Sequence, residues 1–393
     1  MMLAAVLVLN GCGVLESVKQ EVRSFLVDKQ AEIYGEQFEM VSEDEMEISR
    51  EQVRPEDYAY SQLSEEEQSL YLELFSILIS YREDVKLTSM DPEQVDRVYQ
   101  TIMMDHPELF YLDGYTITTH TIEDKTAFYT FTGQYNRTME EKAKAEEQIK
   151  VKTGRILAEI DAEASDYEKV KYVYDHIVLN TVYDEESDDN QNIISVFLNN
   201  ASVCQGYAYA TQYLLKELGI PCTTVTGMAV NRDGSEVTHA WNLVRLDGLY
   251  YYVDTTWGDP IIKNGTDNSE ILDDEYINYD YLNLTTERMS RDHRVESPVT
   301  LPECVSEEHY YYRVEDLLYE TYDRDRIREK VKKAKEAGAE KLVMKFPDET
   351  VFQKHIDQLF EGQEIFGITP ELRSVSYTAD QESCLLIIYL AED

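Results

Sequence analysis

The feature that most constrains the fold of this chain is a two-residue turn, Asp247-Gly248, between two runs of strand-forming residues. Asp-Gly is a strong signal for a tight β-hairpin, because both turn positions require a backbone that these residues tolerate. The flanking runs, 238–246 (THAWNLVRL) and 249–257 (LYYYVDTTW), are rich in aromatic and β-branched side chains. They predict two antiparallel strands with Leu246 opposite Leu249.

Counting outward from this turn brings one histidine close to one aspartate. The register pairs Trp241 with Asp254 and His239 with Thr256. His239 and Asp254 are then diagonal neighbours on one face of the hairpin, about 7–8 Å apart along the backbone. Because an imidazole and a carboxylate can bridge that gap with a hydrogen bond, the hairpin predicts a His–Asp pair.

A helix start upstream supplies a candidate nucleophile. Ser202 and Gln205 have the spacing of a capping box, which makes Ser202 the N-cap and Cys204 the second helical residue. Apolar residues continue at helical spacing until Gly219 and Pro221 end the helix. A thiol in the first turn faces unpaired N–H groups and the positive end of the helix dipole, which favour a thiolate.

Cys204, His239 and Asp254 together supply the three roles of a thiol acyl-transfer site. The thiolate attacks a carbonyl carbon, the imidazole moves protons, and the carboxylate orients the imidazole. We expect the main-chain N–H of Cys204 to stabilise the oxyanion.

Three neighbouring side chains are candidates for the cleft around this site. We expect Gln205 to cap the helix, and the alternative is that its side chain donates to the oxyanion. Trp241 and Trp257 are expected to wall the cleft or to pack behind it, not to act in the chemistry.

The same residues resemble the transglutaminase-like domain of bacterial surface proteins. The resemblance rests on Cys204 in a C-x-G-[YF]-A context, on His239-Ala240-Trp241, and on Asp254-x-Thr256-Trp257, and it covers residues 165–260. It implies an α+β, papain/transglutaminase-like core, in which the helix of the nucleophile packs on an antiparallel sheet that carries the histidine and the aspartate. It also implies that Cys204 attacks a carboxamide or a peptide carbonyl.

Three functions fit this pattern. The first is a cysteine peptidase or amidase that passes the acyl group to water, and it is the function we favour. The second is a protein cross-linking transglutaminase, and the third is a non-catalytic surface scaffold that uses the same fold for binding. The substrate is expected to be a peptide or protein, with cell-wall peptide among the candidates.

Composition narrows the partners. With 78 acidic against 36 basic residues, the net charge is −42, which excludes nucleic acid as a partner because phosphates require a basic surface. The cysteines lack the spacing of a metal site, so we expect no metal and no cofactor. We expect the thiols of Cys222, Cys304 and Cys384 to be buried.

The N-terminus resembles an export signal. Residues 2–9 (MLAAVLVL) form a short apolar run that leads into Gly11-Cys12, as in a bacterial lipobox. This predicts a signal peptide over residues 1–12, lipidation of Cys12, and a lipoprotein on the extracellular face of the cell membrane, held there only by its lipid. The alternatives are plain secretion and an ordinary buried N-terminal helix.

A chain of 393 residues is expected to hold two or three domains. Capping signals at Ser64, Asp91-Pro92 and Ser165 predict helix starts in its first half. The predicted organisation after the signal peptide is a stalk or linker (13–57), an N-terminal α+β unit (58–140), the transglutaminase-like domain (141–300) and a C-terminal α/β unit (301–393).

Overall fold

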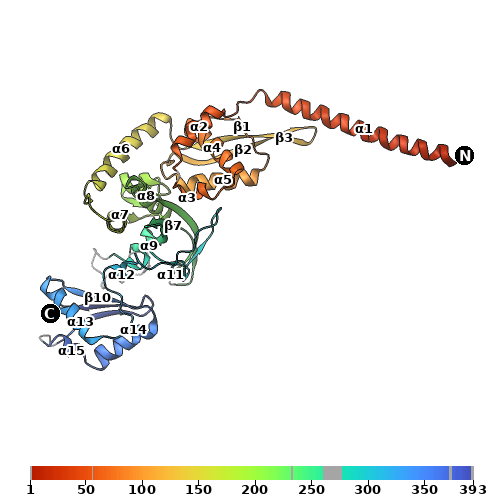
Figure 1. Ribbon diagram of the computed structural model, residues 1–393. Coiled ribbons are helices and arrows are strands. Elements are labelled where there is room, and N and C mark those ends of the chain that lie inside the picture. The colour runs from red at the N-terminus through yellow and green to blue at the C-terminus, as the bar shows by residue number, and fades with distance from the viewer. Residues whose placement is uncertain (1, 55, 232, 260–276, 371–373, 391–393) are drawn as a thin grey trace.

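The computed structural model describes residues 2–54, 56–231, 233–259, 277–370 and 374–390, and it combines helices with four small sheets (Figure 1). Strand pairing is antiparallel except between β4 (Val182–Tyr183) and β5 (Ala201–Ser202). The predicted mixture of helix and sheet is confirmed.

The N-terminal part begins with a long helix that projects from the body of the molecule (Figure 1). Its elements are α1 (Met2–Gly35), α2 (Glu43–Gln52), α3 (Tyr58–Ser61), α4 (Glu65–Ser80), β1 (Val85–Lys86), α5 (Pro92–Asp105), β2 (Leu112–Ile122) and β3 (Lys125–Tyr135). Ser64 caps α4 through a capping box, and Pro92 opens α5, as predicted. Strands β2 and β3 form an antiparallel hairpin.

The described residues of the segment 41–57, which we expected to be part of a linker, instead pack onto the body. Ser42 caps α2, and Val41 and Val53 at its two ends belong to the same buried cluster as the apolar face of α4. Most acidic residues of α2 are exposed, and acidic residues dominate the composition of the segment. Val41 and Val53 are buried in the cluster that contains α4 and Met46 packs against it, whereas Ile48 is exposed, so composition alone underestimates the order of the segment.

The middle of the chain packs helices on a four-stranded sheet of order β8-β7-β6-β9 (Figure 1). Its helical elements are α6 (Met139–Leu157), α7 (Asp166–Asn180), the π-helix η1 (Ser195–Asn199), α8 (Cys204–Glu217), α9 (Thr255–Gly258), the 3-10 helix η2 (Tyr279–Tyr281) and α11 (Thr286–Met289). Its strands are β6 (Cys222–Val230), β7 (Glu236–Leu246), β8 (Leu249–Val253) and β9 (His293–Val295). The Asn242 side chain in β7 donates to the Ala208 carbonyl in α8 at 3.0 Å.

The predicted boundary near residue 140 does not separate two cores. One hydrophobic cluster runs from Val41 to Leu282 and includes α4, α5 and α8. Polar contacts also join the two parts of the chain. Lys216 near the end of α8 binds Asp57 Oδ1 at 2.8 Å, and Thr223 donates to Asp105 at 2.8 Å. The N-terminal unit and the central sheet therefore share one interior.

The C-terminal part is a helix-and-sheet unit. Its elements are α12 (Tyr311–Val314), α13 (Arg324–Glu336), β10 (Lys341–Lys345), α14 (Glu349–Ile356), the π-helix η3 (Asp357–Glu361), α15 (Ile365–Ile368), β11 (Tyr377–Asp380) and β12 (Leu385–Tyr389). Its sheet is antiparallel, in the order β10-β12-β11. Leu386 and Ile388 face the helices of the unit, whereas Leu385 and Ile387 join a cluster with aromatic residues of the central sheet.

No helix within the described part of the chain is both long and apolar enough to cross a membrane. Cys12 falls within the span of α1, but its side chain lies outside the described residues, and its lipidation stays a prediction.

Candidate active site

Cys204 is the first residue of α8, a helix of 14 residues, and it is half-buried. The N-cap is Val203, which provides no side-chain hydrogen bond, so the predicted capping box is wrong. The Ser202 hydroxyl lies 2.6 Å from Ser195 Oγ and donates to the Asn190 carbonyl at 2.9 Å. Because Ser202 pairs in β5, its side chain points toward Asn190 and Ser195. The first N–H groups of α8 are therefore left without a side-chain cap.

Gly206 explains the close fit of this helix start. A Cβ at this position would overlap Ser202 Oγ and would crowd Ser195 Oγ and the Asn190 carbonyl. A larger residue would push the first turn of α8, and with it Cys204, away from the loop.

His239 lies in β7 opposite Gly227 in β6, and it is buried. Its Nε2 is 2.8 Å from Asp254 Oδ2, so the predicted His–Asp hydrogen bond is present. Because Nε2 is bound to Asp254, Nδ1 is the ring nitrogen that can interact with Cys204. Burial alone would lower the pKa of His239, but the charge and hydrogen bond of Asp254 and a hydrogen bond with Cys204 raise it to about 10.

The hairpin register is correct at the turn and wrong at its far end. Leu246 pairs with Leu249 as predicted, but the ladder stops at Asn242 and Val253. Asp254 leaves the strand and becomes the N-cap of α9. The predicted pairs of Trp241 with Asp254 and of His239 with Thr256 therefore do not form.

The change of direction at Asp254 has a local cause. Its Oδ1 accepts from the backbone N–H groups of Thr256 at 2.9 Å and Trp257 at 3.1 Å, which starts a helical turn. Burial would raise the pKa of the Asp254 carboxyl, but the neighbouring His239 and His293 hold it well below its usual range.

A second histidine, which sequence reasoning missed, also contacts Asp254. His293 in β9 places Nε2 3.1 Å from Asp254 Oδ2 and Nδ1 2.6 Å from Asp292 Oδ1. No spacing or turn signal relates it to the hairpin, because the pairing of β9 with β6 alone brings it there.

The two imidazoles and the carboxylate also form a donor set of the kind that holds divalent metals. One ligand atom from each of His239, Asp254 and His293 lies within 4.8 Å of the others. Two hydrogen bonds to a single oxygen account for this proximity without an ion.

The two tryptophans pack around these rings and do not wall the cleft. Both are buried, and their ring centroids lie 6.0 Å (Trp241) and 5.5 Å (Trp257) from that of His239. Neither is among the described residues that line the hollow in front of Cys204. Of the two positions expected for Trp241 and Trp257, wall of the cleft or packing behind it, the structure shows the second.

The hollow in front of Cys204 has a volume of about 390 Å³. It is lined by Tyr183, Glu185, Asn190, Gln191, Val203, Cys204, Gln205, Thr226, Thr238 and His239. Among these described residues there is no lysine or arginine. Gln205 does not cap α8, and it lines the hollow beside Cys204.

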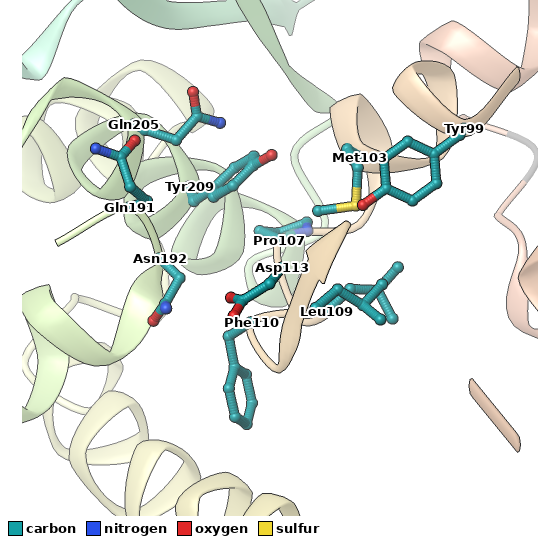
Figure 2. Close-up of a pocket in the computed structure, with 11 residues that line it drawn as sticks. Tyr99, Met103, Pro107, Leu109, Phe110, Asp113, Gln191, Asn192, Gln205 and Tyr209 are labelled. Carbon is teal, nitrogen blue, oxygen red and sulfur yellow. The ribbon is translucent and has the colours of Figure 1, made fainter. Parts of the chain in front are cut away.

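A second hollow of about 220 Å³ adjoins the first, and Gln191 and Gln205 line both. Figure 2 shows it between Gln191, Gln205 and Tyr209 on one side and side chains of α5 and the segment that follows, such as Met103 and Phe110, on the other. The N-terminal unit therefore contributes one wall of the surface next to Cys204.

The remaining described cysteines differ from Cys204 in environment. Burial raises the pKa of the Cys222 thiol and raises that of Cys304 to about 12. Cys384, predicted to be buried, is only half-buried, although burial still raises its pKa.

Comparison with known proteins agrees with the fold. Residues 155–255 match the family model of the transglutaminase-like superfamily, so this part of the chain is a transglutaminase-like domain. The matched span contains Cys204, His239 and Asp254, whereas His293 lies beyond it.

The chain is also similar to the kyphoscoliosis peptidases of Mus musculus and Homo sapiens, with 28 % and 26 % identity over 144 residues. Each alignment covers 33 % of this chain and 22 % of the relative, so the chain spans about a fifth of the length of these curated relatives. Among solved structures, a crystal structure of a TGase has a TM-score of 0.26 and 20 % identity and covers 36 % of this chain and 45 % of that chain. The periplasmic domain of TgpA from Pseudomonas aeruginosa has a TM-score of 0.21 and 13 % identity, over 37 % of this chain and 63 % of that chain.

Proposed function

We propose that this protein is a thiol acyl-transfer enzyme, a cysteine peptidase or amidase that acts on peptide or protein carboxamides through Cys204, His239 and Asp254. The observation that carries the proposal is the placement of Cys204 at an uncapped helix start, in one hollow with a buried imidazole whose Nε2 is bound by a carboxylate. A thiolate beside an imidazolium is the reactive form of a cysteine nucleophile.

The reaction proceeds through a thioester. The Cys204 thiolate attacks the carbonyl carbon and forms a C–S bond, while the oxyanion faces the unpaired N–H groups of the first turn of α8. His239 gives its proton to the nitrogen of the leaving amine as the C–N bond breaks. Water then attacks the thioester, loses a proton to His239 and releases the acid, which restores the thiolate and the imidazolium.

A peptide substrate is favoured by the shape and charge of the surface. The hollow at Cys204 and the second hollow share Gln191 and Gln205, so an extended chain that passes these two side chains can place neighbouring side chains in both. Asp113 and Glu185 are the acidic residues along them. Anionic polymers such as nucleic acid are therefore disfavoured.

Two alternatives remain. A cross-linking transglutaminase would form the same thioester and pass it to an amine, a reaction that is equally compatible with the superfamily match. A non-catalytic scaffold would use the cleft for binding only.

Product analysis separates these functions. Purified protein is incubated with a peptide library, with and without a primary amine, and products are identified by mass spectrometry. New free carboxylates indicate hydrolysis, and amine adducts indicate transamidation. Binding without any product, in wild type as in Cys204→Ala, would contradict the enzyme proposal.

Selective alkylation tests the nucleophile without a substrate. Iodoacetamide near pH 6 should label Cys204 before the other described thiols, because it alone combines a helix start with a histidine partner. Earlier labelling of Cys384, the other half-buried thiol, would count against the assignment.

We also propose that lipidation of Cys12 anchors the protein to the outer face of the cell membrane. The support is the short apolar run before Gly11-Cys12. A fatty-acid probe in the native cells should label the protein, and Cys12→Ala should remove the label. Unlabelled protein in the medium would indicate plain secretion.

A further inference from the structure

Four hydrogen-bond donors surround the carboxylate of Asp254. Its Oδ2 accepts from His239 at 2.8 Å and from His293 at 3.1 Å. Its Oδ1 accepts from the backbone N–H groups of Thr256 and Trp257. Rotation of this carboxylate would break several of these bonds at once, so its orientation is set from both sides.

The orientation of the His293 ring is set in turn by a second carboxylate. Its Nδ1 lies 2.6 Å from Asp292 Oδ1, and the Tyr281 hydroxyl donates to Asp292 Oδ2 at 2.5 Å. The side chain of His293 is 0 % exposed, and the rings of Trp257 and Trp241 lie 4.6 Å and 5.0 Å from it. A buried ring with both nitrogens bonded is a costly way to fill space, since an apolar side chain would need no partners.

The contact between His293 and Asp254 depends on Gly227. Gly227 in β6 faces β9, and a Cβ there would overlap the Arg294 carbonyl and crowd the Trp241 ring. The register sets His239 opposite Gly227 and His293 opposite Ala229, so the two imidazoles lie on the same face of the sheet. Close approach of β9 therefore brings His293 to Asp254.

We propose that His293 is a positioning residue, which holds Asp254 and, through it, the His239 imidazole in the orientation needed for proton transfer with Cys204. Asp292 supports His293 in this role. The inference rests on the proposed function, and it extends the Cys–His–Asp set by a group from a strand outside the matched domain.

The test compares two substitutions of His293 in the full chain. His293→Gln keeps an N–H donor for Asp254, whereas His293→Leu removes it. The matched control is His355→Gln, at a buried histidine of the C-terminal unit whose Nδ1 lies 2.7 Å from the Val351 carbonyl. Single-turnover acylation by an activated peptide ester is measured over a range of ester concentrations.

His293→Leu should lower the maximal acylation rate by about 10-fold to 100-fold with an unchanged half-saturating concentration, because the substrate does not touch this residue. His293→Gln should recover most of the rate, and His355→Gln should match wild type. A wild-type rate in His293→Leu, or a Gln variant as slow as the Leu variant, overturns the inference. If wild type forms no acyl-enzyme at all, the proposed function itself has failed.

Two further measurements keep the inference testable in every case. The downfield N–H proton resonance of His239, assigned by its loss in His239→Gln, should persist in His293→Gln and shift or vanish in His293→Leu, with no substrate needed. Should His293→Leu not fold, Asp292→Ala, at a side chain 26 % exposed, should slow acylation by about 3-fold to 10-fold. A wild-type rate in Asp292→Ala, or an unchanged resonance in His293→Leu, contradicts the positioning role.

Discussion

The central sheet and the C-terminal sheet are both small, antiparallel and covered by helices, yet strands β7 and β9 of the first and strand β12 of the second bury different kinds of side chain. In the central sheet, His239 and His293 converge on one carboxylate at the end of the hairpin. In the C-terminal sheet, the buried residues of β12 are aliphatic, with Leu386 and Ile388 facing the helices of the unit.

This difference separates chemistry from packing. Ionisable groups away from water destabilise a fold unless each has a partner, so a buried set in which every member is bonded marks a region shaped by more than stability. Aliphatic residues stabilise the fold without directing any group. The C-terminal sheet also uses its other face, with Leu385 and Ile387, to cover the aromatic cluster behind the central sheet.

The largest expected effect comes from the nucleophile and its base. Cys204→Ala and His239→Ala should each remove nearly all turnover, and the double variant should be little worse, because the two groups act as a unit. Single-turnover acylation across the three variants measures this. Multiplying losses in the double variant would mean that the two residues act independently.

Loss of the Asp254 carboxylate should reduce the acylation rate less than loss of Cys204 or His239. Asp254→Ala should slow acylation by about 100-fold, because the imidazole loses its orientation and tautomer. Asp254→Asn should restore little, since four donors point at the carboxylate and an amide offers only one acceptor oxygen. A near-wild-type rate in Asp254→Asn would show that the charge and the full set of bonds are not needed.

A substitution in the C-terminal sheet should lower the stability of the protein and leave the reactivity of Cys204 unchanged. Ile388→Ala leaves a cavity at a fully buried site and should lower the free energy of unfolding by about 2–5 kcal/mol. The alkylation rate of Cys204 at temperatures where the variant stays folded should not change. Slower alkylation of Cys204 in the folded variant would show that the C-terminal sheet influences the site on the central sheet.

The smallest effect is a pH dependence of stability. The pKa of His239 is raised in the folded chain to about 10, so its contribution is fully present below its unfolded pKa and is lost as pH rises toward 10. The melting temperature of wild type should therefore fall between pH 7 and pH 10, by about 2–4 °C for each kcal/mol lost. His239→Gln should melt with a flatter profile, and parallel profiles would contradict this assignment.

Much of this arrangement follows from the sequence itself. Asp247-Gly248 determines the turn and the first pairs of the hairpin, and Gly219 and Pro221 determine where α8 ends. Signals of this kind act within a few residues, through the conformations a residue allows or the N–H group it caps, so they can be identified without knowledge of the rest of the molecule.

Tertiary structure alone decided the remaining features. Ser202 has the spacing of a cap, but its hydroxyl contacts Ser195 and Asn190 instead. Residues 41–54 have the composition of a linker, yet Val41 and Val53 are buried in the same cluster as the apolar face of α4. The contact of His293 with Asp254 depends on β9 approaching β6 at Gly227, between segments far apart in the chain. Such contacts form only when the whole interior packs, because the groups that compete for each hydrogen bond come from distant parts of the sequence.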